Sequence, residues 1–260
     1  MTDSILGKSV AYLKTDVRRN LTGLKYISWY KDKLTVNLVE DNQKWALLIE
    51  IPSKILSFDT ANYPKADKAI FLNGTSEQLK YKLLDTLPQS NYILRLNEDL
   101  DLSVLSNRFA INKANSFISL TCSTFNVSAK DNMVTGNTLL TDEAIDMIKR
   151  NGYSESEIKN FFNNGSVWFG LTINEKIRSI CFIYQNYGDI WEIAGVHTLE
   201  KERNKGYAQI VVMSALAYIL ERNLFPKYEV NVRNTNSIKL ARSLNMKEFV
   251  RINHFLLSSL

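Results

Sequence analysis

The stretch LEKERNKGYAQIVV (residues 199–212) changes character at a single glycine. Five of the six residues from Glu200 to Lys205 are charged, whereas no charged residue follows Gly206 until Glu221. The apolar residues after the glycine predict a long helix over 207–222, which is apolar on most of its circumference and therefore covered on more than one side. The sequence thus predicts a charged loop that leads directly into a buried helix.

The start of this helix is a candidate anion site. The first N–H groups of a helix have no partner within it, and the helix dipole adds partial positive charge there. Gly206 lacks a Cβ, so a ligand can approach the backbone closely, and Arg203 and Lys205 add full charges at the rim. These features suit a pyrophosphate. The alternative is a solvated, charged turn that merely precedes a helix.

The second half of the chain has a regular order of predicted elements. Short polar turns separate three apolar strands, which predicts an antiparallel meander. The predicted order is helix 141–150, helix 154–162, strands 166–173, 177–184 and 190–198, helix 207–222, strand 228–232, helix 235–244 and one or two strands within 247–257.

The first half is mixed helix and strand, and it carries no charged motif that indicates chemistry. A polar stretch over 128–136 predicts a domain boundary, which gives domains 1–130 and 131–260. The predicted elements of the first half are a helical region 5–30, strands 34–39, 45–51, 69–72, 92–96 and 117–125, and a helix 76–87 behind a Thr75/Ser76 cap.

Composition narrows the classes of function. The chain has 260 residues, 45% hydrophobic, and a net charge of +5 from 32 basic and 27 acidic residues. This mild excess suits an anionic small ligand, whereas nucleic-acid binders usually show a dense basic stripe. No signal-peptide core or membrane span is evident, and the two histidines and two cysteines have no metal-ligand spacing. We expect buried thiols at Cys122 and Cys181, a cytoplasmic location, no membrane partner and no metal.

Two spaced motifs in this order resemble the GNAT acyltransferase superfamily. Arg203-x-x-Gly206-x-Ala208 resembles its Arg/Gln-x-x-Gly-x-Gly/Ala signature, and 234–246 (NTNSIKLARSLNM) resembles its second motif, with Asn245-Met246 in place of the usual Gly-Phe. The element order from about 132 to 260 is also similar to that fold. The resemblance implies an α/β (α+β) fold with a mixed, mostly antiparallel sheet flanked by helices. The second motif and the extra N-terminal domain look most like the glycine N-acyltransferase-like branch.

The resemblance implies transfer of an acetyl or acyl group from acetyl-CoA to a small-molecule or peptide amine. The pyrophosphate loop of the family maps onto the charged loop, its pantetheine-pairing strand onto the preceding strand, and its cofactor-contacting Asn onto the start of the second motif. The implied cofactor-binding residues are Ala194, Val196, His197, Thr198, Arg203, Asn204, Lys205, Gly206, Tyr207, Ala208, Asn234 and Ser237.

Glu192 is the leading candidate for the general base. It lies eleven residues before Arg203, and the resemblance implies a catalytic Glu at that spacing. Its apolar neighbours Trp191 and Ile193 would desolvate the carboxylate and make it a stronger base; the alternative is a structural ion pair. His197 is a second candidate, but a separation of five residues places it on the opposite face of the strand unless a bulge intervenes.

The usual general acid of the family, a Tyr, is replaced by Ala241. Tyr207, Tyr228 or water could act instead, and the sequence does not choose among them. This departure keeps a second hypothesis open, namely a catalytically silent acyl-CoA-binding regulatory module. A third is a tandem-domain transferase that uses aminoacyl-tRNA. The first half could be a second, degenerate copy of the fold, since strand–helix–strand 69–96 follows the order of 190–232. Monomer and homodimer both remain open.

Overall fold

The computed structural model describes residues 2–122 and 133–260, and it divides into two compact units. Unit 1 comprises Met1–Ile118 and Val250–Leu260, and unit 2 comprises Ser119–Phe249. These ranges differ from the predicted 1–130 and 131–260, because the final strand pairs with a strand of the first half. The polar stretch that predicts the boundary lies partly outside the described residues, and its last part forms a strand.

Unit 2 contains the elements that the motifs predict. β7, β8 and β9 form the expected antiparallel meander, and β9 pairs with β10 in parallel. The strand order is β5-β10-β9-β8-β7-β6, where β5 contributes its last residues. The elements are β6 (Val134–Asn137), α5 (Asp142–Lys149), α6 (Glu155–Asn163), β7 (Val167–Ile173), β8 (Lys176–Tyr187), β9 (Ile190–Thr198), α7 (Tyr207–Leu220), β10 (Phe225–Asn231) and α8 (Thr235–Ser243).

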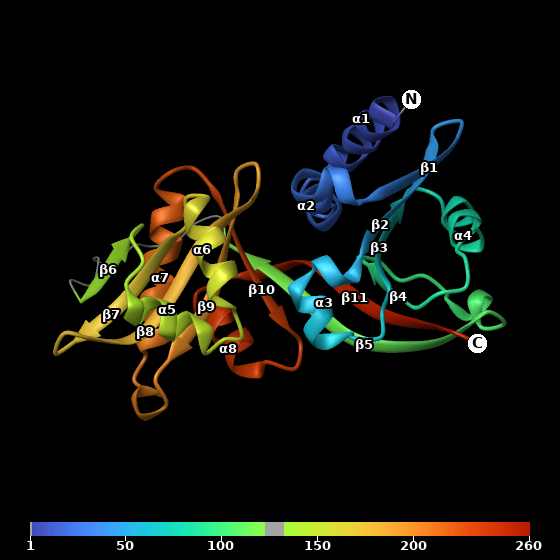
Figure 1. Cartoon of the computed structure of the whole chain (residues 1–260). Coiled ribbons are helices and arrows are strands. Elements are labelled where there is room, and N and C mark those ends of the chain that lie inside the picture. The colour runs from blue at the N-terminus through green and yellow to red at the C-terminus, as the bar shows by residue number, and fades with distance from the viewer. Residues whose placement is uncertain (1, 123–132) are drawn as a thin grey trace. The chain divides into compact units, whose positions relative to one another are not determined.

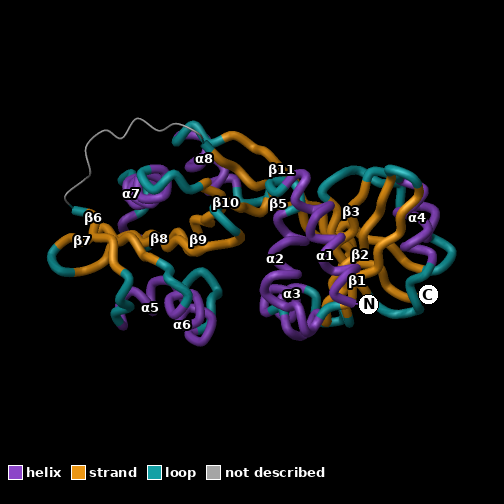
Figure 2. The backbone as a smooth tube through the Cα atoms, turned by 90° about the horizontal axis from the view of Figure 1, so that it is seen from above, coloured by secondary structure: helices purple, strands orange, loops and turns teal. Residues whose placement is uncertain are grey.

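The helices of unit 2 cover both faces of its sheet, with α5 and α6 on one side and α7 and α8 on the other (Figure 2). Alternation along β8 explains this arrangement, because successive strand residues point to opposite faces. Ile180, Phe182 and Tyr184 pack in one apolar cluster with residues of α5 and α6. Cys181 points the other way, and its Sγ lies 3.4 Å from the carbonyl oxygen of Val211 on α7. The meander therefore has a buried face on each side.

Unit 1 is built on the strand order β1-β2-β3-β4-β11-β5. β3 and β4 are parallel neighbours, and α4 connects them (Figure 1). This strand–helix–strand unit has the same order and the same parallel pairing as β9–α7–β10. The elements are α1 (Thr2–Leu13), α2 (Leu21–Tyr30), β1 (Thr35–Asp41), β2 (Lys44–Pro52), α3 (Ser57–Asn62), β3 (Lys68–Gly74), α4 (Glu77–Asp85), β4 (Tyr92–Leu96), β5 (Phe109–Thr121) and β11 (Lys247–Ser259).

The helical region predicted over 5–30 is two helices rather than one. The side chain of Asn20 donates a hydrogen bond to the carbonyl oxygen of Leu13, 3.0 Å away, and its backbone N–H donates to the carbonyl of Asp16. These bonds satisfy groups at the end of α1 and turn the chain before α2. A short side chain that bonds to the nearby backbone thus overrides the apolar periodicity.

Unit 1 also buries a charged network. Arg95 on β4 forms an ion pair with the buried Asp59, and its Nε donates to His254 Nε2 at 3.3 Å. Burial and the Arg95 charge hold the pKa of His254 well below its usual value, so this histidine is neutral. Tyr63 lies 2.9 Å from its other ring nitrogen. The network explains His254 as a structural residue of unit 1.

Both cysteines are free and buried, as predicted. None of the helices within the described residues is long and apolar enough to cross a membrane.

Candidate functional site

The loop between β9 and α7 ends in a left-handed glycine. Gly206 has φ of 81° and is the N-terminal flanking residue of α7, with no side-chain cap. A Cβ at this position would meet nothing within 4 Å. The backbone conformation therefore favours glycine, and the space in front of it is open.

Backbone N–H groups gather at this loop. Those of residues 204–208 donate to no protein acceptor within the described part of the chain. The side chains of Lys205 and Arg178 both form ion pairs with Glu202, at 2.8 and 3.6 Å. The Glu202 side chain thus links the loop to Arg178 on β8. Arg203 is exposed and makes no ion pair with a described residue. Free N–H groups, a helix start and a guanidinium without an ion pair are together the features of a candidate anion site.

The strands beside this loop separate. β9 and β10 pair in parallel from Ile190↔Phe225 to Ile193↔Tyr228, and the pairing ends there. From Ala194 to Thr198, β9 keeps only its pairing with β8. One backbone edge of this segment, which includes Val196, is thus left without a neighbouring strand in the described structure. An extended group carrying amides could pair with this edge as a strand does.

A bulge in β9 lies in the same segment. Phe182 pairs with Ala194, but Ile180 pairs with His197, so three steps along β9 match two along β8. Gly195 has φ of +60°, and a Cβ there would lie 2.6 Å from the ring of Phe182. The extra residue reverses the alternation of side chains. His197 therefore lies on the same face as Glu192, which is the outcome expected where a bulge intervenes.

Glu192 does not have the apolar surroundings that its sequence neighbours predict. Its Oε2 accepts hydrogen bonds from Lys227 Nζ and from Asn186 Nδ2, each at 2.6 Å. Lys227 lies directly opposite Glu192 on β10, and its Nζ also donates to Glu229 at 2.8 Å. The lysine side chain is 6% exposed. Glu192 is thus part of a buried ionic chain, which corresponds to the structural alternative in the sequence analysis.

Burial and the paired charges decide the protonation states of the groups in and around this ionic chain. Burial alone would lower the pKa of Lys227, but the adjacent carboxylates Glu192 and Glu229 raise it, so the ammonium stays charged. Burial raises the pKa of Tyr184 and of Tyr153, and nearby Glu192 and Glu229 raise both further. Both phenols therefore remain protonated beside the carboxylates.

His197 is only partly buried and lies near the loop. Burial lowers its pKa, and the charges of Arg150 and Arg203 lower it further. The imidazole is thus held neutral at physiological pH, in the form that can accept a proton. Thr198, the next residue, is engaged with β8 through a 2.8 Å contact between its Oγ1 and Ser179 Oγ.

The second motif forms the start of α8. Asn234 Oδ1 accepts from the backbone N–H of Ser237 at 3.1 Å, so this side chain caps the helix. Tyr228 Oη donates to Ser237 Oγ at 3.3 Å, and burial raises the pKa of Tyr228 to about 12. Ala241 is fully buried. The structure thus gives Asn234 and Ser237 a local structural role and leaves no group at position 241 that could donate a proton.

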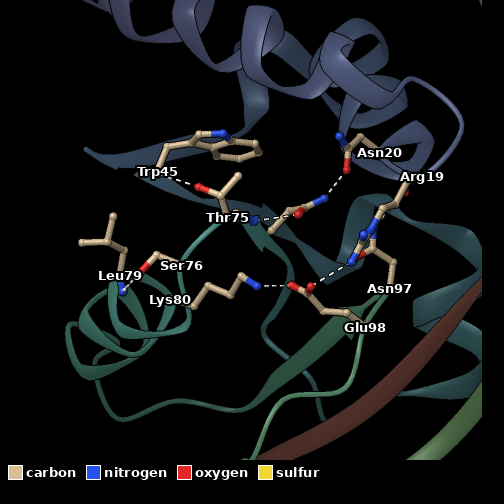
Figure 3. Close-up of polar contacts among 11 residues, drawn as sticks. Arg19, Asn20, Trp45, Thr75, Ser76, Leu79, Lys80, Asn97 and Glu98 are labelled. Carbon is tan, nitrogen blue, oxygen red and sulfur yellow. Dashed lines mark hydrogen bonds and ion pairs between the residues drawn. The ribbon is translucent and has the colours of Figure 1, made fainter. Parts of the chain in front are cut away.

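In unit 1, protein atoms bind backbone N–H groups at the corresponding position, between β3 and the start of α4 (Figure 3). Ser76 caps α4 by accepting from the backbone N–H of Leu79. The N–H of Thr75 donates to the carbonyl oxygen of Trp45, and the N–H of Gly74 donates to Asn73 Oδ1. The N–H groups of Gly74 and Thr75, which precede α4 as those of Asn204 and Lys205 precede α7, are therefore satisfied by protein atoms.

The carboxylate of Glu98 makes further polar contacts in this part of unit 1. Glu98 binds Arg19 and the buried Lys80 of α4, as Figure 3 shows. Lys80 is therefore already paired with a carboxylate. The start of α7 in unit 2 is therefore the candidate anion site.

Sequence reasoning missed the partners of Glu192. Asn186, Lys227 and Glu229 lie on two other strands, and only the register of β8, β9 and β10 brings them together. Lys227 and Glu229, two residues apart in the otherwise uncharged run 225–230, are the signal in the sequence that points to a buried ion pair. No three His, Cys, Asp or Glu side chains of the described residues are grouped to hold a metal ion.

Comparisons with known proteins agree with this architecture. The sequence model of the GNAT acetyltransferase family matches residues 14–248. A comparison with curated proteins finds no match.

Solved structures resemble the chain over nearly its whole length. The GCN5-related N-acetyltransferase-like protein from Streptococcus suis has a TM-score of 0.55 at 15% identity, over 97% of this chain and 98% of that one. A GCN5-related N-acetyltransferase from Kribbella flavida has a TM-score of 0.57 at 10% identity, over 92% and 95%. A tandem GNAT protein from the clavulanic acid biosynthesis pathway has a TM-score of 0.58 at 8% identity, over 99% and 95%.

At these identities the structural likeness is one of fold, and the mixed, mostly antiparallel sheet flanked by helices agrees with the predicted fold class. The glycine N-acyltransferase-like branch stays a prediction. The match of the family's sequence model, which spans most of the sequence, shows that this chain belongs to the GNAT acetyltransferase family.

Proposed function

We propose that this chain is an N-acetyltransferase that transfers an acetyl group from acetyl-CoA to a primary amine. One observation carries the proposal: the open N–H groups of residues 204–208 lie where β9 and β10 have just separated. Coenzyme A needs an anion site for its pyrophosphate and an unpaired strand edge for its amide-bearing arm. Unit 2 has features suited to both, in adjacent segments of the chain.

The residues of unit 2 would divide the binding between them. The N–H groups of 204–208, with Arg203, would hold the pyrophosphate, and the free edge of 194–198 would pair with the pantetheine amides. Asn234 uses its Oδ1 for the helix cap, so its Nδ2 is the atom left for a ligand. Acetyl-CoA supplies the activated thioester.

Acyl transfer needs the acceptor nitrogen to lose a proton as it forms the bond to the thioester carbon and the thiolate leaves. We propose that the Glu192 carboxylate accepts this proton. A general base of this kind contributes about 10²- to 10⁴-fold to a rate. We assign no general acid, because Ala241 cannot donate and the Tyr228 hydroxyl already donates to Ser237.

Changing Glu192 to Gln should lower the turnover number by about 100-fold or more and leave coenzyme A affinity unchanged. Gln keeps a carbonyl oxygen for Lys227 and so preserves most of the packing. The measurements are thiol release from acetyl-CoA with a panel of amines, and calorimetric titration with coenzyme A. His197→Gln is the comparison on the same strand face. Turnover like that of the wild type in Glu192→Gln would remove Glu192 from the mechanism.

The buried Lys227 supports a second candidate, an acyl-CoA-binding module without catalysis. The Glu192 Oε2 already accepts from the Lys227 ammonium and from Asn186, each at 2.6 Å, so this oxygen is engaged in structural contacts. Thiol release separates the two candidates, since the silent module would bind acetyl-CoA but release no thiol with any amine in the panel. A cytoplasmic location and a small-molecule or peptide acceptor belong to the catalytic proposal.

A further inference from the structure

His254 on β11 lies buried between two side chains of unit 1, and its two ring nitrogens have different partners. The residue is 6% exposed. Arg95 Nε donates to Nε2 at 3.3 Å, and Tyr63 Oη lies 2.9 Å from Nδ1. Because an arginine N–H can only donate, Nε2 must be the nitrogen without a proton. The single proton of the neutral ring is therefore on Nδ1, which donates it to Tyr63 Oη.

The hydrogen bond between His254 and Arg95 joins two neighbouring strands through their side chains. β11 and β4 are antiparallel, and these two residues are directly opposite each other in the register. Side chains at such a pair lie on the same face, with Cβ atoms about 4.5–5.5 Å apart. A change from attraction to repulsion between these two side chains therefore acts directly on the pairing of β11.

A proton on Nε2 would make this change. It would place an imidazolium N–H against the guanidinium N–H, with two positive charges in place of a hydrogen bond. Asp59 of α3, the carboxylate of this network, binds Arg95. The ring of Tyr26 on α2 also faces this guanidinium, at 5.6 Å from its centroid. The charged group in contact with His254 is thus the arginine, and the acidic side chain is bound to that same arginine.

The other side chains around the imidazole are neutral. The ring centroids of Phe117, Tyr63 and Phe58 lie 5.0, 5.8 and 6.3 Å from that of His254. Asn115 of β5 donates to Tyr63 Oη at 2.8 Å, so this phenol oxygen accepts from an amide as well as from the histidine. Burial and the adjacent guanidinium charge both lower the pKa of His254. These surroundings therefore stabilise a neutral imidazole and oppose a charged one.

We infer that His254 is an acid-sensitive switch in unit 1: the neutral ring holds β11 against β4, and uptake of one solvent proton at Nε2 separates the two strands. Separation breaks the bond to Arg95 and lets water reach both cations. This inference goes beyond the proposed acetyl transfer and does not depend on it, because all the side chains involved belong to unit 1.

The direction of the pH effect follows from the two states of the histidine. The pKa of His254 is well below its ordinary value in the folded protein and about 6.5 in the unfolded chain. The unfolded chain therefore binds the extra proton. The stability that the neutral ring contributes is fully present above about pH 6.5 and is lost as the pH falls from there toward the folded value. Burial raises the pKa of Asp59, and proton uptake by such a carboxyl favours the folded state, so Asp59 cannot cause this loss.

Amide hydrogen exchange of the whole chain tests the switch, because the protection factor of a backbone N–H measures how often its segment opens. Each protection factor is corrected for the intrinsic exchange rate at the same pH. At 92–96 of β4 and 253–257 of β11, which pair with each other, it should fall about tenfold between about pH 6 and pH 5, as one proton per opening requires. Constant protection over this range would overturn the inference.

His254→Gln removes the switch and keeps an amide oxygen that can accept from Arg95. Because this amide takes up no proton between about pH 6 and pH 5, the protection factors of both segments should stay constant in the variant. His197→Gln is the matched control, since the chain has two histidines and His197 belongs to unit 2. This control should keep the fall seen in the wild type. A fall that persists in His254→Gln, or one that disappears in His197→Gln, would contradict the switch.

NMR of the unsubstituted protein supplies a second measurement, which does not depend on the folding of a variant. Correlation spectra of the nitrogen-15-labelled imidazole should show the proton of His254 on Nδ1 and none on Nε2 at neutral pH. A proton on Nε2 at neutral pH would overturn the inference, because the bond from Arg95 could not then hold the two strands together.

Discussion

Replacing Gly206 with valine should weaken coenzyme A binding by about 10- to 100-fold. The valine side chain would fill the open space in front of the N–H groups of 204–208, where a Cβ now meets nothing within 4 Å. Losing one or two hydrogen bonds to a charged group costs about 1.5–3 kcal/mol each, and 1.4 kcal/mol is a factor of ten in affinity. Calorimetric titration with coenzyme A measures the change directly.

Gly165→Val is the matched control. Gly165 has φ of +86°, against +81° for Gly206, and a Cβ there would also meet nothing within 4 Å. Both variants should therefore lose about 1–2 kcal/mol of stability, because a left-handed conformation disfavours residues with a Cβ. Only Gly206→Val should lose affinity. Equal affinities in the two variants would show that the start of α7 does not hold the cofactor.

Changing Lys227 to Met should lower the free energy of unfolding by about 3–5 kcal/mol. The variant leaves Glu192 and Glu229 close together with no ammonium between them, and removing one partner of a buried ion pair has costs of this size. Chemical denaturation at neutral pH measures the change. The pKa of Lys227 is raised in the folded state, so its contribution is fully present below its unfolded value and is lost only as the pH rises through the higher folded value. Neutral pH is thus within the range where the full effect applies.

Lys159→Met tests whether burial is the cause. Lys159 makes an ion pair with Glu155 at 2.6 Å, the same distance as Lys227 to Glu192, but the Lys159 side chain is 58% exposed. An exposed pair of this kind contributes about 0–1 kcal/mol. Adding Glu192→Gln to Lys227→Met should restore part of the lost stability, because it removes one of the unpaired charges. If Lys227→Met costs no more than Lys159→Met, the ionic chain is not the buried feature described above.

Much of unit 2 could be predicted from the sequence, because its signals are local. The turns between β7, β8 and β9, the helix that begins after Thr141 and the switch of character at Gly206 each depend on a few neighbouring residues, and the structure has them as predicted. The break between α1 and α2 was missed, because it depends on the side chain of Asn20 rather than on apolar periodicity.

The surroundings of Glu192 could not be predicted, because they depend on register. Whether Lys227 faces Glu192 is decided by the parallel pairing of β9 and β10, and a shift of one residue would turn that lysine to the other face. The bulge at Gly195 had the same effect on His197. A glycine within a strand is a sequence signal for a bulge, but its consequence for a residue two positions away appears only once the pairing is known.

We propose that unit 2 binds coenzyme A at the start of α7 and along the free edge of β9. Hydrogen–deuterium exchange with and without saturating coenzyme A tests it most directly, because it reads the backbone N–H groups themselves. We expect slower exchange at 204–208 and at 194–198 and no change at 72–79, where Gly74 and Thr75 already donate to Asn73 and Trp45 and Glu98 is paired with Lys80. Protection at 72–79 instead, or none at 204–208, would contradict it.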